Sequence, residues 1–89
     1  MANHASAKKR IRQTKKRTER NRAVRSTTRS VVKRVRTALA DGDAQAAEQH
    51  LAVATRKIDT AVRKGVYHWK TGARYISRLS RQVAALKAS

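Results

Sequence analysis

Residues 24–43, VRSTTRSVVKRVRTALADGD, contain the pattern from which the fold class is predicted. Apolar residues recur here at spacings of 7, 1, 3 and 4, which place one stripe along an α-helix: Val24, Val31, Val32, Val35 and Leu39. The hydroxyl residues of 25–30 lower helix propensity and leave a break possible, but the stripe keeps its phase across them. We therefore expect one continuous amphipathic helix that ends at the turn Asp41-Gly42-Asp43.

Two more apolar stripes follow this turn. The first contains Ala47, Leu51, Ala54, Ile58, Ala61 and Val62, and the second contains Trp69, Gly72 or Ala73, Ile76, Leu79, Val83 and Leu86. The Asp43 carboxylate can cap the start of the second helix, and Gly65 supplies the left-handed residue that favours its end. Three stripes of similar length predict an all-α, three-helix antiparallel bundle in one domain over 1–89, with helices at 1–40, 44–64 and 69–87.

The beginning of the first helix differs from its end. When the stripe is extended backwards it meets only polar residues: Asn21, Arg17, Thr14 and Arg10. The first half therefore overhangs the bundle, starting from a cap at Asn3 or Ser6. Because like charges crowd this half and no core holds it, we expect residues before about Asn21 to be partly disordered in the free protein.

Positive charge dominates the chain. Lys and Arg number 23 against five acidic residues, and 14 of the 23 lie in residues 1–40 with Glu19 as the one acid. The charges of residues 8–17 surround the helix axis, whereas a solvated helix face usually mixes both signs. Phosphates would remove their mutual repulsion and release counterions. A second basic ridge recurs at spacings of 4, 4 and 3 on the third helix: Lys70, Arg74, Arg78 and Arg81. The pattern indicates nucleic-acid binding.

The same composition excludes several classes of function. Without Cys, neither a disulfide framework nor a Cys-based zinc site can form, and the three His residues are scattered. We expect no metal or cofactor, and no catalytic triad or phosphate-cradling glycine loop suggests an enzyme. The longest apolar stretches, such as residues 51–54, are too short for a signal peptide or membrane span. A membrane-surface peptide is disfavoured because the most basic segment has almost no apolar face.

Only three aromatic residues are present, Tyr67, Trp69 and Tyr75. They could stack on bases, but Trp69 falls on the third apolar stripe, which favours an anchor in the core. His68 could contact phosphate or cap the third helix, and the sequence leaves both roles open.

The ordered motifs of this chain resemble the S20 family of bacterial small-subunit ribosomal proteins. The resemblance runs end to end through Ser6-Ala7-Lys8-Lys9-Arg10, Gly42-Asp43, Lys64-Gly65-Val66-Tyr67-His68 and Ser77-Arg78-Leu79. Similar members usually continue the His with Lys-Asn, where this chain has Trp69-Lys70, and Gly72 stands where Ala is usual. The resemblance implies a three-helix protein that binds 16S ribosomal RNA directly, with its first helix buried among RNA helices.

Charge pattern and resemblance together define the expected function. We expect a structural, cytoplasmic component of the small ribosomal subunit, with 16S ribosomal RNA as partner and no homo-oligomer, membrane or small-molecule substrate. The candidate RNA-binding residues are Lys8, Lys9, Arg10, Arg12, Lys15, Lys16, Arg17, Arg20, Arg22, Arg25, Arg29, His68, Lys70, Arg74 and Arg78. A histone-like, DNA-compacting protein is the alternative that the charge alone would equally allow.

Overall fold

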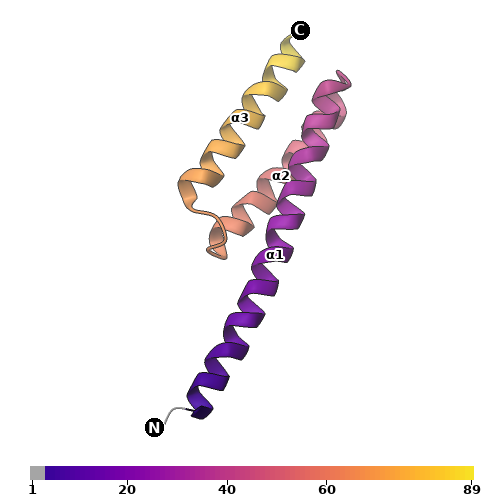
Figure 1. Cartoon of the computed structure of the whole chain (residues 1–89). Coiled ribbons are helices and arrows are strands. Elements are labelled where there is room, and N and C mark those ends of the chain that lie inside the picture. Colours follow the sequence, from indigo (N-terminus) through magenta and orange to yellow (C-terminus); the bar gives the residue numbers. More distant parts are fainter. Residues whose placement is uncertain (1–3) are drawn as a thin grey trace.

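The computed structural model describes residues 4–89 as three α-helices joined by two short connections (Figure 1). The helices are α1 (His4–Ala40), α2 (Ala44–Arg63) and α3 (Trp69–Ala88), and no strand occurs within these residues. This confirms the predicted all-α class. The ends of α2 and α3 differ from the predicted ends by one residue, and the candidate cap Asn3 lies outside the described residues.

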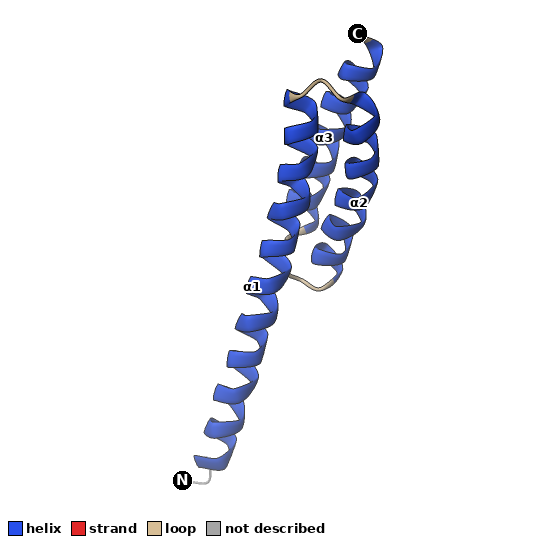
Figure 2. Cartoon of the chain, turned by 90° about the vertical axis from the view of Figure 1, so that its right-hand side faces the viewer, coloured by secondary structure: helices blue, strands red, loops and turns tan. Residues whose placement is uncertain are grey.

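The short turns make successive helices antiparallel, as Figures 1 and 2 show. α2 packs against both other helices, whereas α1 and α3, which run in the same direction, touch each other least. α1 has 37 residues and each of the others has 20, so nearly half of α1 extends past the turn between α2 and α3. The result is an elongated molecule with a longest dimension of 67 Å.

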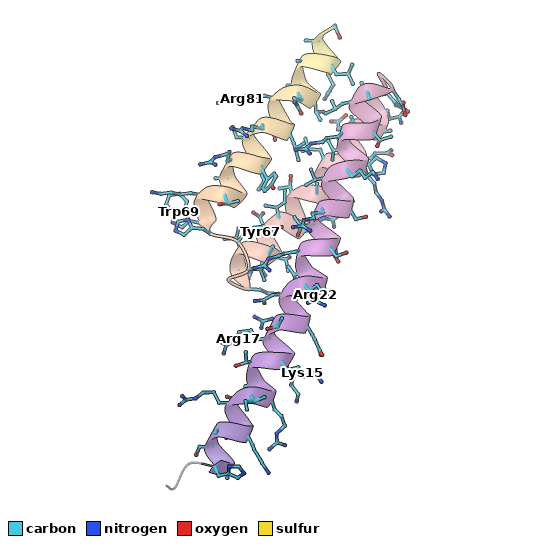
Figure 3. All side chains as sticks on the ribbon, in the orientation of Figure 1. Lys15, Arg17, Arg22, Tyr67, Trp69 and Arg81 are labelled. Carbon is cyan, nitrogen blue, oxygen red and sulfur yellow. The ribbon has the colours of Figure 1, made fainter. Side chains whose placement is uncertain are left out.

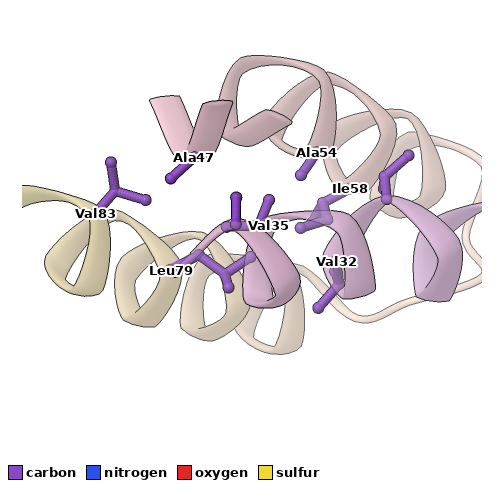
Figure 4. Packing of buried hydrophobic residues seen from close by; sticks show 9 residues of the cluster. Val32, Val35, Ala47, Ala54, Ile58, Leu79 and Val83 are labelled. Atoms are coloured by element: carbon purple, nitrogen blue, oxygen red, sulfur yellow. The ribbon is translucent and has the colours of Figure 1, made fainter. Parts of the chain in front are cut away.

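The core is small and made of short side chains (Figure 4). Ile58 and Val35 are the largest side chains that are fully buried. Three alanines of α2, at positions 47, 54 and 61, are also fully buried, and their small side chains let the neighbouring helices approach closely. The stripes predicted for α1 and α2 face this core, with Val24, Leu39, Leu51 and Val62 at its half-buried margin.

The hydroxyl-rich segment 25–30 of α1 stays helical because the buried hydroxyl of Thr28 finds a hydrogen-bond partner within the helix. Thr28 is 2% exposed, and its hydroxyl donates a hydrogen bond to the carbonyl oxygen of Val24 at 2.9 Å. A buried hydroxyl bonded within its own helix leaves no polar atom unpaired in the interface. The expected continuity of α1 is confirmed.

Both turns have the chemistry that the sequence predicts. The Asp43 carboxylate accepts a hydrogen bond from the backbone N–H of Ala46 at 3.0 Å, so Asp43 is the N-cap of α2. Gly42 and Gly65 adopt φ angles of 70° and 77°, in the left-handed region where a Cβ atom would be strained. These two turns set the antiparallel arrangement.

Trp69 does not anchor the core, so the prediction made for it is wrong. Its side chain is 62% exposed. α3 begins at Trp69, and the first residue of this helix that packs inward is Gly72, which is buried against Val62 and Ile58. The buried part of the α3 stripe therefore starts at Gly72, about one turn later than the spacing suggested, while Trp69 and Lys70 before it are exposed.

The N-terminal part of α1 forms a basic arm, defined here as residues 4–20. Every residue of the basic arm is exposed, yet the structure has it helical from His4, against the expectation of partial disorder. Its residues are mostly strong helix formers, and no Gly or Pro interrupts them. Ser6 lies inside the helix rather than at its start, so it is not the N-cap. Only bonds within the helix itself hold the basic arm in shape.

Truncating Ile58 tests the assignment of the core. Ile58→Ala is expected to lower the free energy of unfolding by about 2–5 kcal/mol, since the side chain is fully buried. Leu51→Ala, at a half-buried position of the same helix, should cost clearly less. Urea denaturation followed by circular dichroism measures both, and equal losses would contradict the assigned packing.

Gly72 allows a second test of the packing between α2 and α3. A Cβ atom at this position would lie 2.5 Å from Cγ2 of Val62, whose branched side chain has little rotamer freedom. The overlap costs about 1–3 kcal/mol, whereas replacing glycine inside a helix gains about 1 kcal/mol. Gly72→Ala should therefore destabilise the chain but become stabilising in a Val62→Ala background. A double-mutant cycle measures this, and independent effects would contradict the contact.

Candidate nucleic-acid interface

The basic arm carries eight of the candidate residues: Lys8, Lys9, Arg10, Arg12, Lys15, Lys16, Arg17 and Arg20. All eight are exposed. They lie around the whole circumference of the helix, and Figure 3 shows Lys15 and Arg17 projecting to opposite sides of it. A helix that is basic on every side can receive phosphates from more than one direction.

Carboxylates neutralise very little of this charge. Within residues 4–89 the structure contains one ion pair, between Lys87 Nζ and Glu48 Oε1 at 3.0 Å. It joins α2 to α3 far from the basic arm, and both side chains are at least half exposed. Glu19, the one acid of the basic arm, is in no such pair. Of the 23 basic residues, 22 therefore keep their charge available for an external anion.

The other candidates lie on the bundle. Arg22, Arg25 and Arg29 continue the basic surface along α1, and Lys70, Arg74 and Arg78 lie on α3; all six are exposed. His68 is the N-cap of α3, where its Nδ1 accepts a hydrogen bond from the backbone N–H of Lys70 at 3.2 Å. Its capping role is thus observed, and the proton of the neutral ring is assigned to Nε2, which is left free to donate.

A groove between α1 and α3 brings candidates from both helices together. It consists of two adjoining hollows of about 420 and 250 Å³ that share Arg36 and Tyr75. The basic side chains that line it are Arg29, Lys33 and Arg36 from α1 and Arg74 and Arg78 from α3, without any carboxylate. We call this feature the α1–α3 groove. It exists because α1 and α3 pack on α2 more than on each other.

Two aromatic rings line the α1–α3 groove: Tyr75 borders both hollows, and Tyr67 borders the smaller one. Tyr67 and Tyr75 form an edge-to-face pair with ring centroids 6.2 Å apart. Together with Val32 they add apolar surface to the smaller hollow, which is also lined by Arg29, Lys33 and Arg36. This combination suits a phosphate or sugar better than an apolar ligand.

Acidic residues gather at the opposite end of the molecule. A hollow of about 370 Å³ beside the turn between α1 and α2 is lined by Asp41 and Asp43 as well as by Lys33 and Arg34. Its mixed charge distinguishes it from the α1–α3 groove. The molecule is therefore polarised along its length, with its most basic surface on the basic arm and its least basic surface at this turn.

Sequence reasoning missed two residues of the α1–α3 groove, Lys33 and Arg36. The signal was present, because Arg29, Lys33 and Arg36 recur at spacings of 4 and 3 on one side of α1. The structure brings Arg29, Arg74 and Arg78 to this groove, whereas the eight cations of the basic arm stay apart from it.

None of the helices in residues 4–89 has the length and apolar character needed to cross a membrane.

Two comparisons with known proteins, one with family models and one with individual proteins, agree with each other. The family model for ribosomal protein S20 matches residues 2–84. Small ribosomal subunit protein bS20 of Geotalea uraniireducens (strain Rf4) is 58% identical over 86 residues, which cover 97% of this chain and 99% of the relative. The bS20 protein of Solidesulfovibrio magneticus is 53% identical over 89 residues and all of both chains. With its three helices, its basic arm and this end-to-end similarity, the chain belongs to the ribosomal protein S20 family.

Proposed function

We propose that this chain is a structural component of the small ribosomal subunit and that, as a monomer in the cytoplasm, it binds 16S ribosomal RNA directly through the candidate residues described above. One observation carries the proposal: the basic arm projects from the bundle with eight exposed cations and no ion pair among them. The like charges of such an arm repel one another in the free protein, and the phosphates of a bound RNA would remove this repulsion.

The distribution of charge suggests the mechanism. Cations on all sides of the basic arm require phosphates on all sides, so the arm lies between RNA segments rather than on one surface. There it neutralises the repulsion between RNA backbones that approach one another and thereby stabilises their packing. Arg outnumbers Lys by 14 to nine, and each guanidinium can bind phosphate oxygens through two parallel hydrogen bonds. Recognition by such contacts depends on RNA shape more than on base sequence.

Direct RNA binding is tested by footprinting on purified 16S ribosomal RNA. The chain should protect defined RNA segments from hydroxyl-radical cleavage, and it should sediment with the small subunit in cell extracts. A competition with duplex DNA at physiological salt separates this function from DNA compaction. Equal affinity for DNA and for folded 16S ribosomal RNA would favour the histone-like alternative.

The α1–α3 groove gives a prediction about the bundle itself. Replacing Arg36 and Arg78 together by Ala should lower affinity for 16S ribosomal RNA by about a hundredfold, since both residues line the same hollow and each hydrogen bond to a charged group is worth about 1.5–3 kcal/mol, with about 1.4 kcal/mol for each factor of ten. The matched control is Arg56→Ala with Arg63→Ala, two exposed cations of α2 outside every hollow described here. Filter binding measures both variants. Equal losses would show that only total charge matters.

A further inference from the structure

Trp69 is the most unusual residue on the surface of this molecule. It is the chain's one tryptophan, and its side chain is 62% exposed. Figure 3 shows it at the start of α3, projecting away from α1. A tryptophan ring left in water by the fold is a large apolar surface available to a partner.

The fold leaves this ring uncovered because of the residues one helical turn further on. Side chains three and four positions apart are neighbours on a helix surface, and for Trp69 these positions hold Gly72 and Ala73. Gly72 has no side chain and is packed against Val62, while Ala73 contributes one methyl group and is itself exposed. The residues one turn further along α3 therefore leave the ring largely exposed.

The surroundings of the ring are basic and partly aromatic. The imidazole of His68 is stacked beside it, with centroids 5.8 Å apart and planes 29° from parallel, and the capping hydrogen bond holds that imidazole in place. Nζ of Lys70 lies 5.7 Å from the centroid of the indole. No acidic residue follows Asp59 in the sequence, so α3 supplies only positive charge.

We propose that Trp69 stacks on an unpaired base of the bound RNA, while Lys70 binds a phosphate beside that base. This inference rests on the proposed function. An aromatic ring flanked by cations matches a nucleotide, which joins a flat base to a charged phosphate. Bases within an A-form duplex are already stacked on both faces, so the partner base must come from a loop, bulge or strand end. A single ring among cations offers too little apolar surface for an apolar protein groove.

The single tryptophan makes the proposal directly measurable. Stacking on a base should quench the Trp69 fluorescence strongly when the full chain is titrated with 16S ribosomal RNA. A fully paired RNA duplex, bound to the same occupancy as judged by filter binding, should change the emission little. An unchanged emission with bound 16S ribosomal RNA would overturn the proposal, as would equal quenching by the paired duplex.

Two substitutions separate stacking from charge. Trp69→Ala should lower affinity for 16S ribosomal RNA by about 5- to 100-fold without altering the salt dependence, since it removes a stacking contact. Trp69→Phe should retain part of the affinity. Lys70→Ala, at the adjacent exposed position, should instead reduce the slope of log affinity against log salt by about one. Because Trp69 is exposed, the variants should keep the helical circular dichroism of the parent chain.

Failure of this inference is distinguishable from failure of the proposed function. If the chain fails to bind 16S ribosomal RNA at all, the proposed function is wrong. If it binds tightly but Trp69→Ala binds equally well, only the stacking is wrong. A change in emission that occurs with other small-subunit proteins and not with RNA would assign Trp69 to a protein contact and overturn the proposal.

Discussion

A chain that lacks residues 1–21 is expected to keep its three-helix bundle and to bind 16S ribosomal RNA about a thousandfold more weakly. The deletion removes eight of the 23 basic residues, and among the described residues 4–21 it removes no buried side chain, because the basic arm is exposed and Asn21 is only half-buried. Each lost phosphate contact also gives up the counterions that it would release, which accounts for the size of the effect. Isothermal titration calorimetry or filter binding at fixed salt measures the loss.

The control for this deletion is the stability of the bundle. Urea denaturation of the shortened chain should give nearly the same midpoint as the full chain, because no core contact involves the basic arm. Adding the detached arm peptide at micromolar concentration should not restore affinity, since the bundle positions the arm through continuous helix. Normal RNA binding by the shortened chain would mean that the bundle, and not the basic arm, is the main interface.

Raising the salt concentration from 50 to 200 mM is expected to lower affinity for 16S ribosomal RNA by about 10³–10⁵-fold. This is the dependence of a protein that makes about 6–10 phosphate contacts, and the basic arm and α1–α3 groove together offer more cations than that number. Plotting log affinity against log salt gives the number of contacts directly. A nearly flat plot would contradict the electrostatic mechanism.

The shortened chain provides the internal check on this measurement. Its plot should be less steep by about one unit for each phosphate contact that the basic arm makes. Equal slopes for the full and the shortened chain would show that the cations of the basic arm do not touch phosphate. The two measurements together therefore divide the RNA interface between the basic arm and the bundle.

The identification by resemblance is confirmed by the family match, and with it the expectation of a structural ribosomal protein rather than an enzyme. Motifs such as Lys64-Gly65-Val66-Tyr67-His68 made this possible because their order and spacing are more specific than a lysine-rich start. The turn around Gly65 also has the predicted left-handed glycine. The assignment of individual residues to RNA remains a proposal for the experiments above.

Features that depend on residues close together in the chain could be predicted from the amino-acid sequence alone. Helix spacing, the Asp43 cap and the basic arm all follow from neighbours within one or two turns, and the structure has each of them. The exposure of Trp69 and the groove that Arg36 and Arg78 line together could not be predicted in this way. These features depend on the relative placement of whole helices. The spacing of the apolar stripe on α3 is the same whether its first buried residue is Trp69 or Gly72. The packing of Gly72 against Val62 shows that burial begins at Gly72.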